Sequence, residues 1–189
     1  MMNERRLARH EVIMAGVGGR GVLMAGLLLA QAGLPEYGNV VWLPSYASAM
    51  RGGPCECTVI LSQDGIASPV LSRSQAIIIV EPGQLQAFEG RVRPGGIAVV
   101  ESSGLSRRMQ RDDVTAHYVP AVEKAVSLGN PQVANLVLLG MYLGLTGAVS
   151  PGAIDFVLEK RLAGRGREKL LDLNKRALRE GVALNLDSG

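Results

Sequence analysis

The stretch EVIMAGVGGRGVLMAGLLLAQA, residues 11–32, decides the fold class. Its apolar start at 11–15 predicts a strand, its glycine-rich centre at 16–21 a turn, and the apolar run at 22–32 a helix. Glycines let such a turn reverse tightly and let the helix lie close to the strand. Because the helix is apolar on all sides, we expect the sheet to cover one side of it and another element to cover the other.

The glycine-rich turn has the spacing G-x-G-x-x-G at Gly16, Gly18 and Gly21, which is typical of dinucleotide-binding sites. Backbone amides at the start of the following helix could hold an anion. A dinucleotide site also needs an acidic residue about 20 positions further on, and residues 40–46 contain none. No Lys-Ser or Lys-Thr pair follows the turn, so it is not a phosphate-binding P-loop. Tight packing or a bound anion is therefore favoured over a nucleotide cofactor.

The remaining chain continues the alternation of strands and helices. Apolar runs predict five further strands, at residues 40–43, 58–62, 76–80, 97–100 and 114–119. Helical patterns occur at residues 84–88, 131–145, 150–160 and 165–180. This order predicts an α/β fold, a three-layer α/β/α sandwich with a mostly parallel or mixed sheet and a helical C-terminal end. The 189 residues are expected to form a single domain, residues 1–189.

A second segment, WLPSYASAMRGGPCEC at residues 42–57, predicts a shaped loop between two strands. Pro44 fixes the backbone on the way in, and the pair Gly52 and Gly53 allows a positive φ or a close backbone approach on the way out. Arg51 is the only basic residue of the segment. An arginine in a glycine-rich loop suits bidentate contact with a carboxylate or phosphate, and it equally suits a structural pair with a buried carbonyl or acid.

Composition limits the classes of function. Apolar residues make up 47% and charged residues 20% of the chain, which indicates a globular protein rather than a disordered one. The net charge of +3 does not require a nucleic-acid partner. No apolar signal region opens the chain, so we expect a cytoplasmic protein without a membrane partner.

Residues that could ligate a metal or act as nucleophiles are few. Cys55 and Cys57 are the only cysteines and lie too close in sequence for an easy bridge, so we expect buried thiols that pack as small apolar side chains. The only histidines are His10 and His117, and no metal site is expected. The chain has no G-x-S-x-G motif and no convincing cysteine–histidine pair. We therefore expect a subunit that shapes a site and has no catalytic residue of its own.

The helix predicted at 150–160 starts with the capping signal Ser150-Pro151. The helix predicted at 131–145 starts with the capping signal Asn130-Pro131. Gly140 and Gly144 admit a close neighbour, and the run is too short and too polar for a membrane span. A buried helix, at a subunit contact or elsewhere, fits better. Asn135 on its apolar surface needs a hydrogen-bond partner, either the loop at 46–53 or a backbone carbonyl.

Two basic stretches are expected to be solvated faces. One is the loop at 104–111, which contains three arginines. The other, residues 159–180, contains eight basic and four acidic residues and could instead meet an acidic partner.

Five motifs occur in one order over nearly the whole chain. They are GVGGRG at residues 16–21, LPSYASAMRGG at 43–53, CTVI at 57–60, RPGG at 93–96 and LGNPQVAN at 128–135. In this combination the chain resembles the gamma subunit of 2-oxoacid:ferredoxin oxidoreductases, and the same domain inside single-chain pyruvate:ferredoxin oxidoreductases. It departs from that family at Arg20, where the glycine turn usually carries glutamine.

The resemblance implies a complex that oxidatively decarboxylates a 2-oxo acid with CoA, forms acyl-CoA and CO2, and passes electrons to ferredoxin. Thiamine diphosphate, Mg²⁺ and 4Fe-4S clusters would belong to other subunits, namely alpha, beta and a delta or ferredoxin-like one, while CoA could contact this chain. The favoured substrate is 2-oxoglutarate, because a separate gamma chain without a fused ferredoxin domain is expected in that branch. Pyruvate, branched-chain 2-oxo acids and indolepyruvate stay open.

The resemblance also implies a set of ligand or subunit-contact residues in the turn, the loop and the long helix. They are Gly16, Gly18, Gly19, Arg20, Gly21, Ser45, Tyr46, Met50, Arg51, Gly52, Gly53 and Asn135. Two other classes remain possible at this stage: a purely structural subunit, and a stand-alone nucleotide-binding oxidoreductase.

Overall fold

The computed structural model describes residues 9–46, 52–164 and 166–186. Within these ranges the chain forms a six-stranded sheet with the strand order β2-β3-β1-β4-β5-β6. The strands are β1 (Arg9–Val17), β2 (Asn39–Tyr46), β3 (Pro54–Ser62), β4 (Ser74–Ile79), β5 (Val92–Glu101) and β6 (Thr115–Val119). The α-helices are α1 (Val22–Gly33), α2 (Leu85–Phe88), α3 (Ala121–Ser127), α4 (Ala134–Thr146), α5 (Pro151–Leu162) and α6 (Glu168–Leu186). Short 3-10 turns are η1 (Pro82–Gln84), η2 (Glu89–Arg91) and η3 (Pro131–Val133).

The sheet is mixed, and the predicted α/β fold class is confirmed. Strands β1, β4, β5 and β6 are parallel neighbours, whereas β3 runs antiparallel to both β1 and β2. The predicted bounds of the loop, residues 42–57, are wrong at both ends, because β2 continues to Tyr46 and β3 begins at Pro54. Pro44 is tolerated within β2 because β2 is an edge strand, where a missing N–H need not break a ladder.

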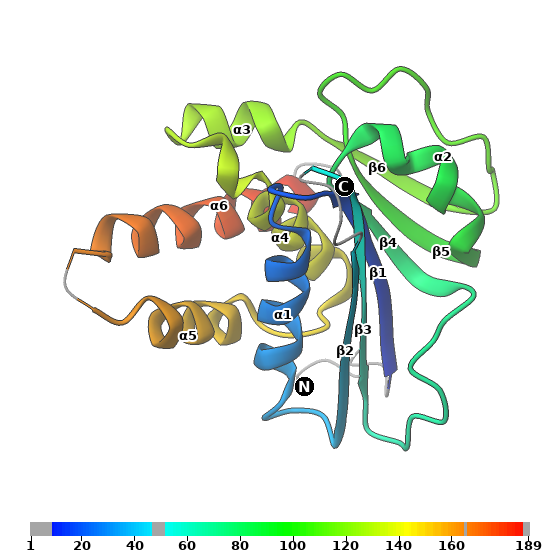
Figure 1. The fold of residues 1–189 in the computed structure, drawn as a ribbon, viewed down its shortest axis with the longest axis horizontal. Coiled ribbons are helices and arrows are strands. Elements are labelled where there is room, and N and C mark those ends of the chain that lie inside the picture. Colours follow the sequence, from blue (N-terminus) through cyan, green and yellow to red (C-terminus); the bar gives the residue numbers. More distant parts are fainter. Residues whose placement is uncertain (1–8, 47–51, 165, 187–189) are drawn as a thin grey trace.

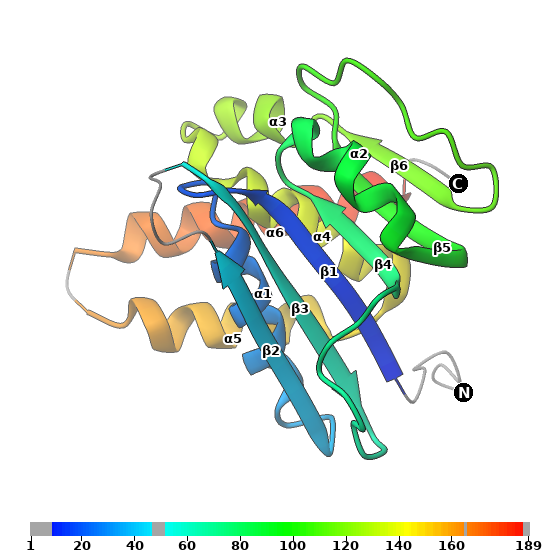
Figure 2. The same cartoon turned by 45° about the vertical axis from the view of Figure 1, so that its right-hand side comes forward.

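Helices cover the two faces of the sheet unequally (Figure 1). On one face, alternate strand residues such as Met14 and Ile78 pack with residues of α1, α4 and α6. On the other face, Ile13 and Ile77 pack with Leu85 of α2 and with the segment that leads into β6. Figure 2 shows α1, α4, α5 and α6 stacked behind the sheet and α2 on the opposite side. The expectation that α1 is covered on both sides is confirmed, since it contacts β3 on one side and α5 on the other.

Helices α4 and α6 cross at very short range. A Cβ built on Gly140 would overlap the carbonyl oxygen of Leu178, and a Cβ built on Gly181 would overlap the backbone of α4. Asn185 on α6 adds a hydrogen bond, donating from Nδ2 to the oxygen of Gly144 at 2.9 Å. The close neighbour expected for the glycine pair of α4 is therefore α6 of the same chain. Among the described helices, none combines the length and the apolarity that crossing a membrane requires.

The predicted helix caps are confirmed. Asn130 Oδ1 accepts the N–H of Gln132 at 2.9 Å at the entrance to η3 and α4. Ser150 Oγ accepts the N–H of Ala153 at 3.1 Å at the start of α5. In both cases Pro follows the capping residue and supplies a preset φ. Helix α6 starts and ends later than the predicted 165–180.

Helix α3 was not predicted, because its first turn is held by a residue distant in sequence. Glu101 lies at the end of β5 and is 1% exposed. Its carboxylate accepts the N–H of Ser103 at 2.6 Å and the N–H of Val122 at 2.9 Å. A cap supplied from 21 positions upstream leaves no local sequence signal.

The arginine-rich loop at 104–111 is only in part the solvated face that was predicted, because Arg108 is exposed whereas Arg107 and Arg111 are half-buried. Arg107 pairs with Glu89, and Arg111 donates to the carbonyl oxygens of Glu89 and Val92 at 2.9 Å and 2.7 Å. These guanidinium groups hold the loop against the sheet. The basic stretch around α6 is partly neutralised as well, because its cations pair with acidic residues of α5.

Candidate functional site at the carboxyl ends of the strands

The sheet changes its winding direction between β1 and β4. The chain leaves β1 for α1 on one face of the sheet, and it leaves β4 through η1 for α2 on the other face. A small pocket lies beyond the carboxyl ends of the two strands, and its lining includes Arg20, Val80 and Pro131. In open α/β sheets this is the usual place for a ligand.

The glycine turn, residues 16–21, lies at this switch point, and its glycines are needed there for space and for backbone conformation. A Cβ on Gly16 would lie 2.8 Å from Cγ2 of Val22 and 3.3 Å from Cβ of Val80, so only glycine allows α1 and β4 this close. Gly19 and Gly21 have φ of 87° and 73°, which side-chain-bearing residues rarely adopt. The predicted tight turn with close helix–strand packing is confirmed.

A second glycine pair meets the turn through the backbone. The N–H of Gly18 donates to the oxygen of Gly53 at 2.9 Å, and a Cβ on Gly18 would lie 3.3 Å from the nitrogen of Gly52. Gly52 has a φ of 78°. This pair precedes β3, whose first residue, Pro54, lies opposite Val17 at the end of β1. Two segments far apart in sequence thus form one continuous, partly exposed surface.

Asn135 ties the start of α4 to the glycine turn. Its Nδ2 donates to the carbonyl oxygen of Gly21 at 3.0 Å, and the same oxygen accepts the N–H of Ala25 at 3.0 Å. A Cβ on Gly21 would overlap the Asn135 amide. Of the two partners expected for Asn135, the structure therefore shows a backbone carbonyl, and this carbonyl belongs to the turn itself.

Arg20 connects the turn after β1 with the segment after β4. Its Nε lies 3.6 Å from Oε2 of Glu81, which follows β4, and the side chains are 49% and 30% exposed. An exposed pair of this kind contributes little to stability, so Arg20 can exchange its partner at little cost. Helix α1 has no acidic residue in its first turn and no side-chain cap. The positive end of the helix dipole and a cation therefore lie side by side.

The strand order does not favour the dinucleotide interpretation. In dinucleotide-binding folds a parallel strand lies beside the first strand and ends in the acid that binds ribose. Here β3 takes that place and runs antiparallel, so its amino end, with Gly53, adjoins the glycine turn. The anion-binding interpretation needs only the amides and the cation, and it remains compatible with this geometry.

The other residues expected at the site divide into two groups. Ser45 and Tyr46 end β2 at the same edge of the sheet, with Ser45 exposed and Tyr46 opposite Cys55. Met50 and Arg51 lie outside the described residues. Glu81 was not predicted as part of the site, although a charged residue directly after a buried strand was a usable signal.

The two cysteines are buried thiols, as expected. Cys55 and Cys57 are free and lie on the same face of β3. Burial raises the pKa of Cys57 to about 12 and also raises the pKa of Cys55. Cys57 packs against α1, where its thiol faces the oxygen of Val22 at 3.7 Å. In the described ranges, no three acidic, histidine or cysteine side chains gather as metal ligands would.

These raised pKa values predict that both thiols react slowly with thiol reagents in the folded chain. At pH 8 the thiolate, which is the reactive form, is almost absent at Cys57. We expect a thiol reagent such as DTNB to label the native chain slowly and the guanidinium-unfolded chain at once, with two thiols per chain. Two equivalents titrated rapidly from the native chain would contradict this burial.

Comparison with known proteins agrees with this geometry. The model of the family "Pyruvate ferredoxin/flavodoxin oxidoreductase" matches residues 11–184. The chain belongs to this family. The match runs from β1 through α6 and includes the glycine turn, the glycine pair before β3 and Asn135.

The chain is similar to a relative that is much longer and to a relative of about the same length. It is 36% identical over 173 residues to the ketoisovalerate oxidoreductase subunit VorA of Methanothermobacter thermautotrophicus, covering 90% of this chain. It spans only about a third, 35%, of that relative's length. The 2-oxoglutarate synthase subunit KorC of Methanocaldococcus jannaschii is 28% identical, with 92% of this chain and 96% of KorC covered.

Solved structures of family members have the same fold. A keto/oxoacid ferredoxin oxidoreductase gamma subunit from Geobacter sulfurreducens superposes with a TM-score of 0.81 at 25% identity, covering 96% of this chain and 98% of that one. A 2-oxoglutarate:ferredoxin oxidoreductase from Magnetococcus marinus superposes with a TM-score of 0.86 at 20% identity, and this chain covers 32% of it. The fold is thus shared by a separate subunit and by part of a longer chain.

Proposed function

We propose that this chain is the gamma component of a 2-oxoacid:ferredoxin oxidoreductase, in which it forms part of the assembly without holding a redox centre. The full-length family match carries the proposal, together with the KorC relative that the chain covers almost completely. The reaction of the complex would be oxidative decarboxylation of a 2-oxo acid with CoA, with electrons passed to ferredoxin. The expected partners are alpha and beta subunits and a delta or ferredoxin-like one.

The residues of this chain do not fit the cofactors of such a reaction. A 4Fe-4S cluster needs four cysteine thiolates, whereas the chain contains two cysteines, both buried within one strand. Thiamine diphosphate with Mg²⁺ needs oxygen ligands for the metal, and no cluster of acidic residues gathers among the described side chains. We therefore assign these cofactors to the partner subunits.

The part that this chain would play is to hold an anionic group at the switch point. Two features support that role: the start of α1, which has no side-chain cap, and Arg20 in a weak surface pair. Arg51 immediately precedes Gly52, whose backbone approaches Gly18. The phosphates of CoA are the anions that the reaction offers to such a surface.

Arg51→Ala is expected to raise the apparent KM for CoA by about tenfold, because one charge-assisted hydrogen bond is worth about 1.5–3 kcal/mol. The variant is assayed in the reconstituted complex, with size-exclusion chromatography to follow assembly. Loss of assembly instead of a changed KM would place Arg51 at a subunit contact. Arg107→Ala is the matched control, since Arg107 holds a loop on the far face of the sheet. Unchanged assembly and kinetics in Arg51→Ala would reject both roles.

The whole proposal is tested by affinity purification of the tagged chain from its native host. We expect thiamine-binding and iron–sulfur subunits to co-purify, and the eluate to reduce a viologen dye only with a 2-oxo acid and CoA. If the chain elutes alone and the eluate lacks this activity, the proposed function is rejected, while the assignment of the fold is unaffected.

The substrate is decided in the same assay. We retain 2-oxoglutarate as the first candidate, and we test 3-methyl-2-oxobutanoate, pyruvate and indolepyruvate beside it. The branched-chain acid is included because the relatives at 34% and 36% identity are named for ketoisovalerate. Chain architecture does not discriminate, since relatives of both lengths match this chain.

A purely structural role for this chain is the second candidate. It is favoured by the fact that the site consists mainly of backbone groups and one weak ion pair. Substitutions at Ser45, Tyr46 and Arg51 that alter assembly but never the KM for CoA would support it.

A further inference from the structure

A second cavity lies at the opposite ends of the strands from the glycine turn. Its volume is about 550 Å³, and it extends between the amino ends of β1, β4 and β5 and the last turn of α4. Its walls are mainly apolar, with Ala76, Ile97, Tyr142 and Leu145 among the lining residues. A volume of this size accommodates a small organic molecule.

Two features at this cavity are polar and buried. His10 is 3% exposed, and its Nε2 has no hydrogen-bond partner among the described residues. Its ring faces Tyr37 edge-on at 6.1 Å, so it lies on the helical side of the sheet. Burial lowers the pKa of His10, which keeps the imidazole neutral at pH 7. A buried nitrogen without a hydrogen-bond partner is costly.

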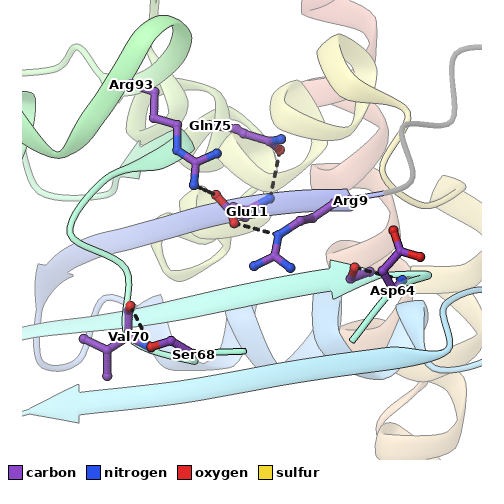
Figure 3. Close-up of polar contacts among 8 residues, drawn as sticks. Arg9, Glu11, Asp64, Ser68, Val70, Gln75 and Arg93 are labelled. Carbon is purple, nitrogen blue, oxygen red and sulfur yellow. Dashed lines mark hydrogen bonds and ion pairs between the residues drawn. The ribbon is translucent and has the colours of Figure 1, made fainter. Parts of the chain in front are cut away.

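The second polar feature is a buried carboxylate between two arginines, shown in Figure 3. Glu11 has a side chain that is 1% exposed, and it pairs with Arg9 Nε at 2.7 Å and with Arg93 Nη2 at 2.5 Å. Gln75 accepts the N–H of Glu11 at 3.1 Å. Two guanidinium groups face one carboxylate, which leaves a surplus of one positive charge at this edge of the sheet.

Of the two arginines, Arg93 is the one that can bind an anion in the cavity. It lines the cavity and is 45% exposed, while its pair with Glu11 fixes the position of the guanidinium. The next residues of β5, Pro94 to Gly96, also line the cavity. An arginine that is anchored on one edge and exposed on the other presents its remaining donors in a defined direction.

We propose that this cavity binds a small carboxylic acid with an apolar body, its chain against Ala76, Ile97 and Leu145 and its carboxylate at Arg93. The apolar lining favours a ligand with an apolar body. The net charge of Arg9, Arg93 and Glu11 favours a ligand with one negative charge. The inference is independent of the proposed function, because the cavity lies at the other end of the sheet from the switch point.

The test uses sodium octanoate and the purified full-length chain in isothermal titration calorimetry, with 1-octanol as the uncharged probe. We expect saturable binding of one octanoate per chain and weaker binding of octanol. Leu145→Trp, which fills the cavity from a half-buried position, should weaken octanoate at least about tenfold. Arg93→Gln should weaken it about threefold to fivefold, because a partly exposed charge contributes only modestly to binding.

Arg107→Gln is the matched control, since Arg107 is also a partly exposed, ion-paired arginine and lies away from the cavity. Amide shifts in ¹⁵N NMR make the test independent of whether a variant folds. Gly95, Gly96 and Thr146 should shift on adding octanoate, and Gly19 and Gly52 should not. Absent or non-saturable binding, or shifts confined to other parts of the chain, would overturn the proposal. Octanol binding as tightly as octanoate, with Arg93→Gln unchanged, would overturn the choice of a carboxylate.

Discussion

Gly181→Ala is expected to lower the free energy of unfolding by about 3 kcal/mol or more, because it inserts a methyl group where α6 touches the backbone of α4. The atoms in the way are the main-chain atoms of Val137 and Met141, which cannot rotate aside as a side chain could. The two helices must move apart, and Ala177 and Leu178 then lose contact with the core. Gly140→Ala should act in the same way, since its Cβ would overlap the oxygen of Leu178.

The measurement is urea unfolding followed by circular dichroism, with the midpoint and slope compared between variants. Gly152→Ala is the matched control: Gly152 lies in a helix too, but a Cβ there would meet only Ser150 Oγ, at 3.9 Å. Helix propensity alone predicts that this control is unchanged or stabilised by up to about 1 kcal/mol. If Gly181→Ala behaves like Gly152→Ala, the close crossing of α4 and α6 is wrong.

Gly21→Ala is expected to destabilise the chain by about 2–4 kcal/mol through two separate effects. Alanine at a φ of 73° is strained by about 1–2 kcal/mol. Its Cβ would also overlap the amide of Asn135, which must then move and give up its hydrogen bond to the carbonyl of residue 21. The loss of a buried hydrogen bond adds about 1 kcal/mol.

Two further variants separate these effects. Gly19→Ala has the strain without the overlap, because φ is 87° and nothing lies within 4 Å of its Cβ. It should therefore lower the stability less than Gly21→Ala does. In the double variant Gly21→Ala/Asn135→Ala the overlap is removed. The double variant should therefore lose less stability than the sum of the losses in the two single variants. Strict additivity would show that Asn135 does not contact the turn.

Gly21→Ala and Gly181→Ala should differ in their effect on the candidate site. Gly21 links the start of α1, the start of α4 and the glycine turn, so a shift there displaces the surface proposed to hold an anion. The atoms nearest to a Cβ on Gly181 belong to Val137 and Met141 of α4 and not to the glycine turn, so Gly181→Ala should affect stability alone. In a complex reconstituted at low temperature, where both variants remain folded, we expect only Gly21→Ala to alter the KM for CoA.

The local structure of this protein could be predicted from its sequence. Short apolar runs between turn signals predicted all six strands, and the glycine turn with the long apolar run after it predicted α1, because buried elements need apolar residues and glycine and proline mark turns. The caps at Asn130 and Ser150 were predicted for the same reason, since a side chain and an amide two or three residues apart always meet in a helix start. The motif order also predicted the family that the comparisons confirm.

Only the tertiary structure decided the partners that are distant in sequence. In the folded chain β3 lies antiparallel beside β1, and the oxygen of Gly53 accepts a hydrogen bond from the glycine turn. Asn135 donates to the oxygen of Gly21. Helix α3 was missed because its cap comes from Glu101, and the cavity beside Arg93 was missed because its walls come from four separate elements. Local patterns depend on neighbours a few residues away, whereas these contacts exist only after the sheet and the helices have packed together.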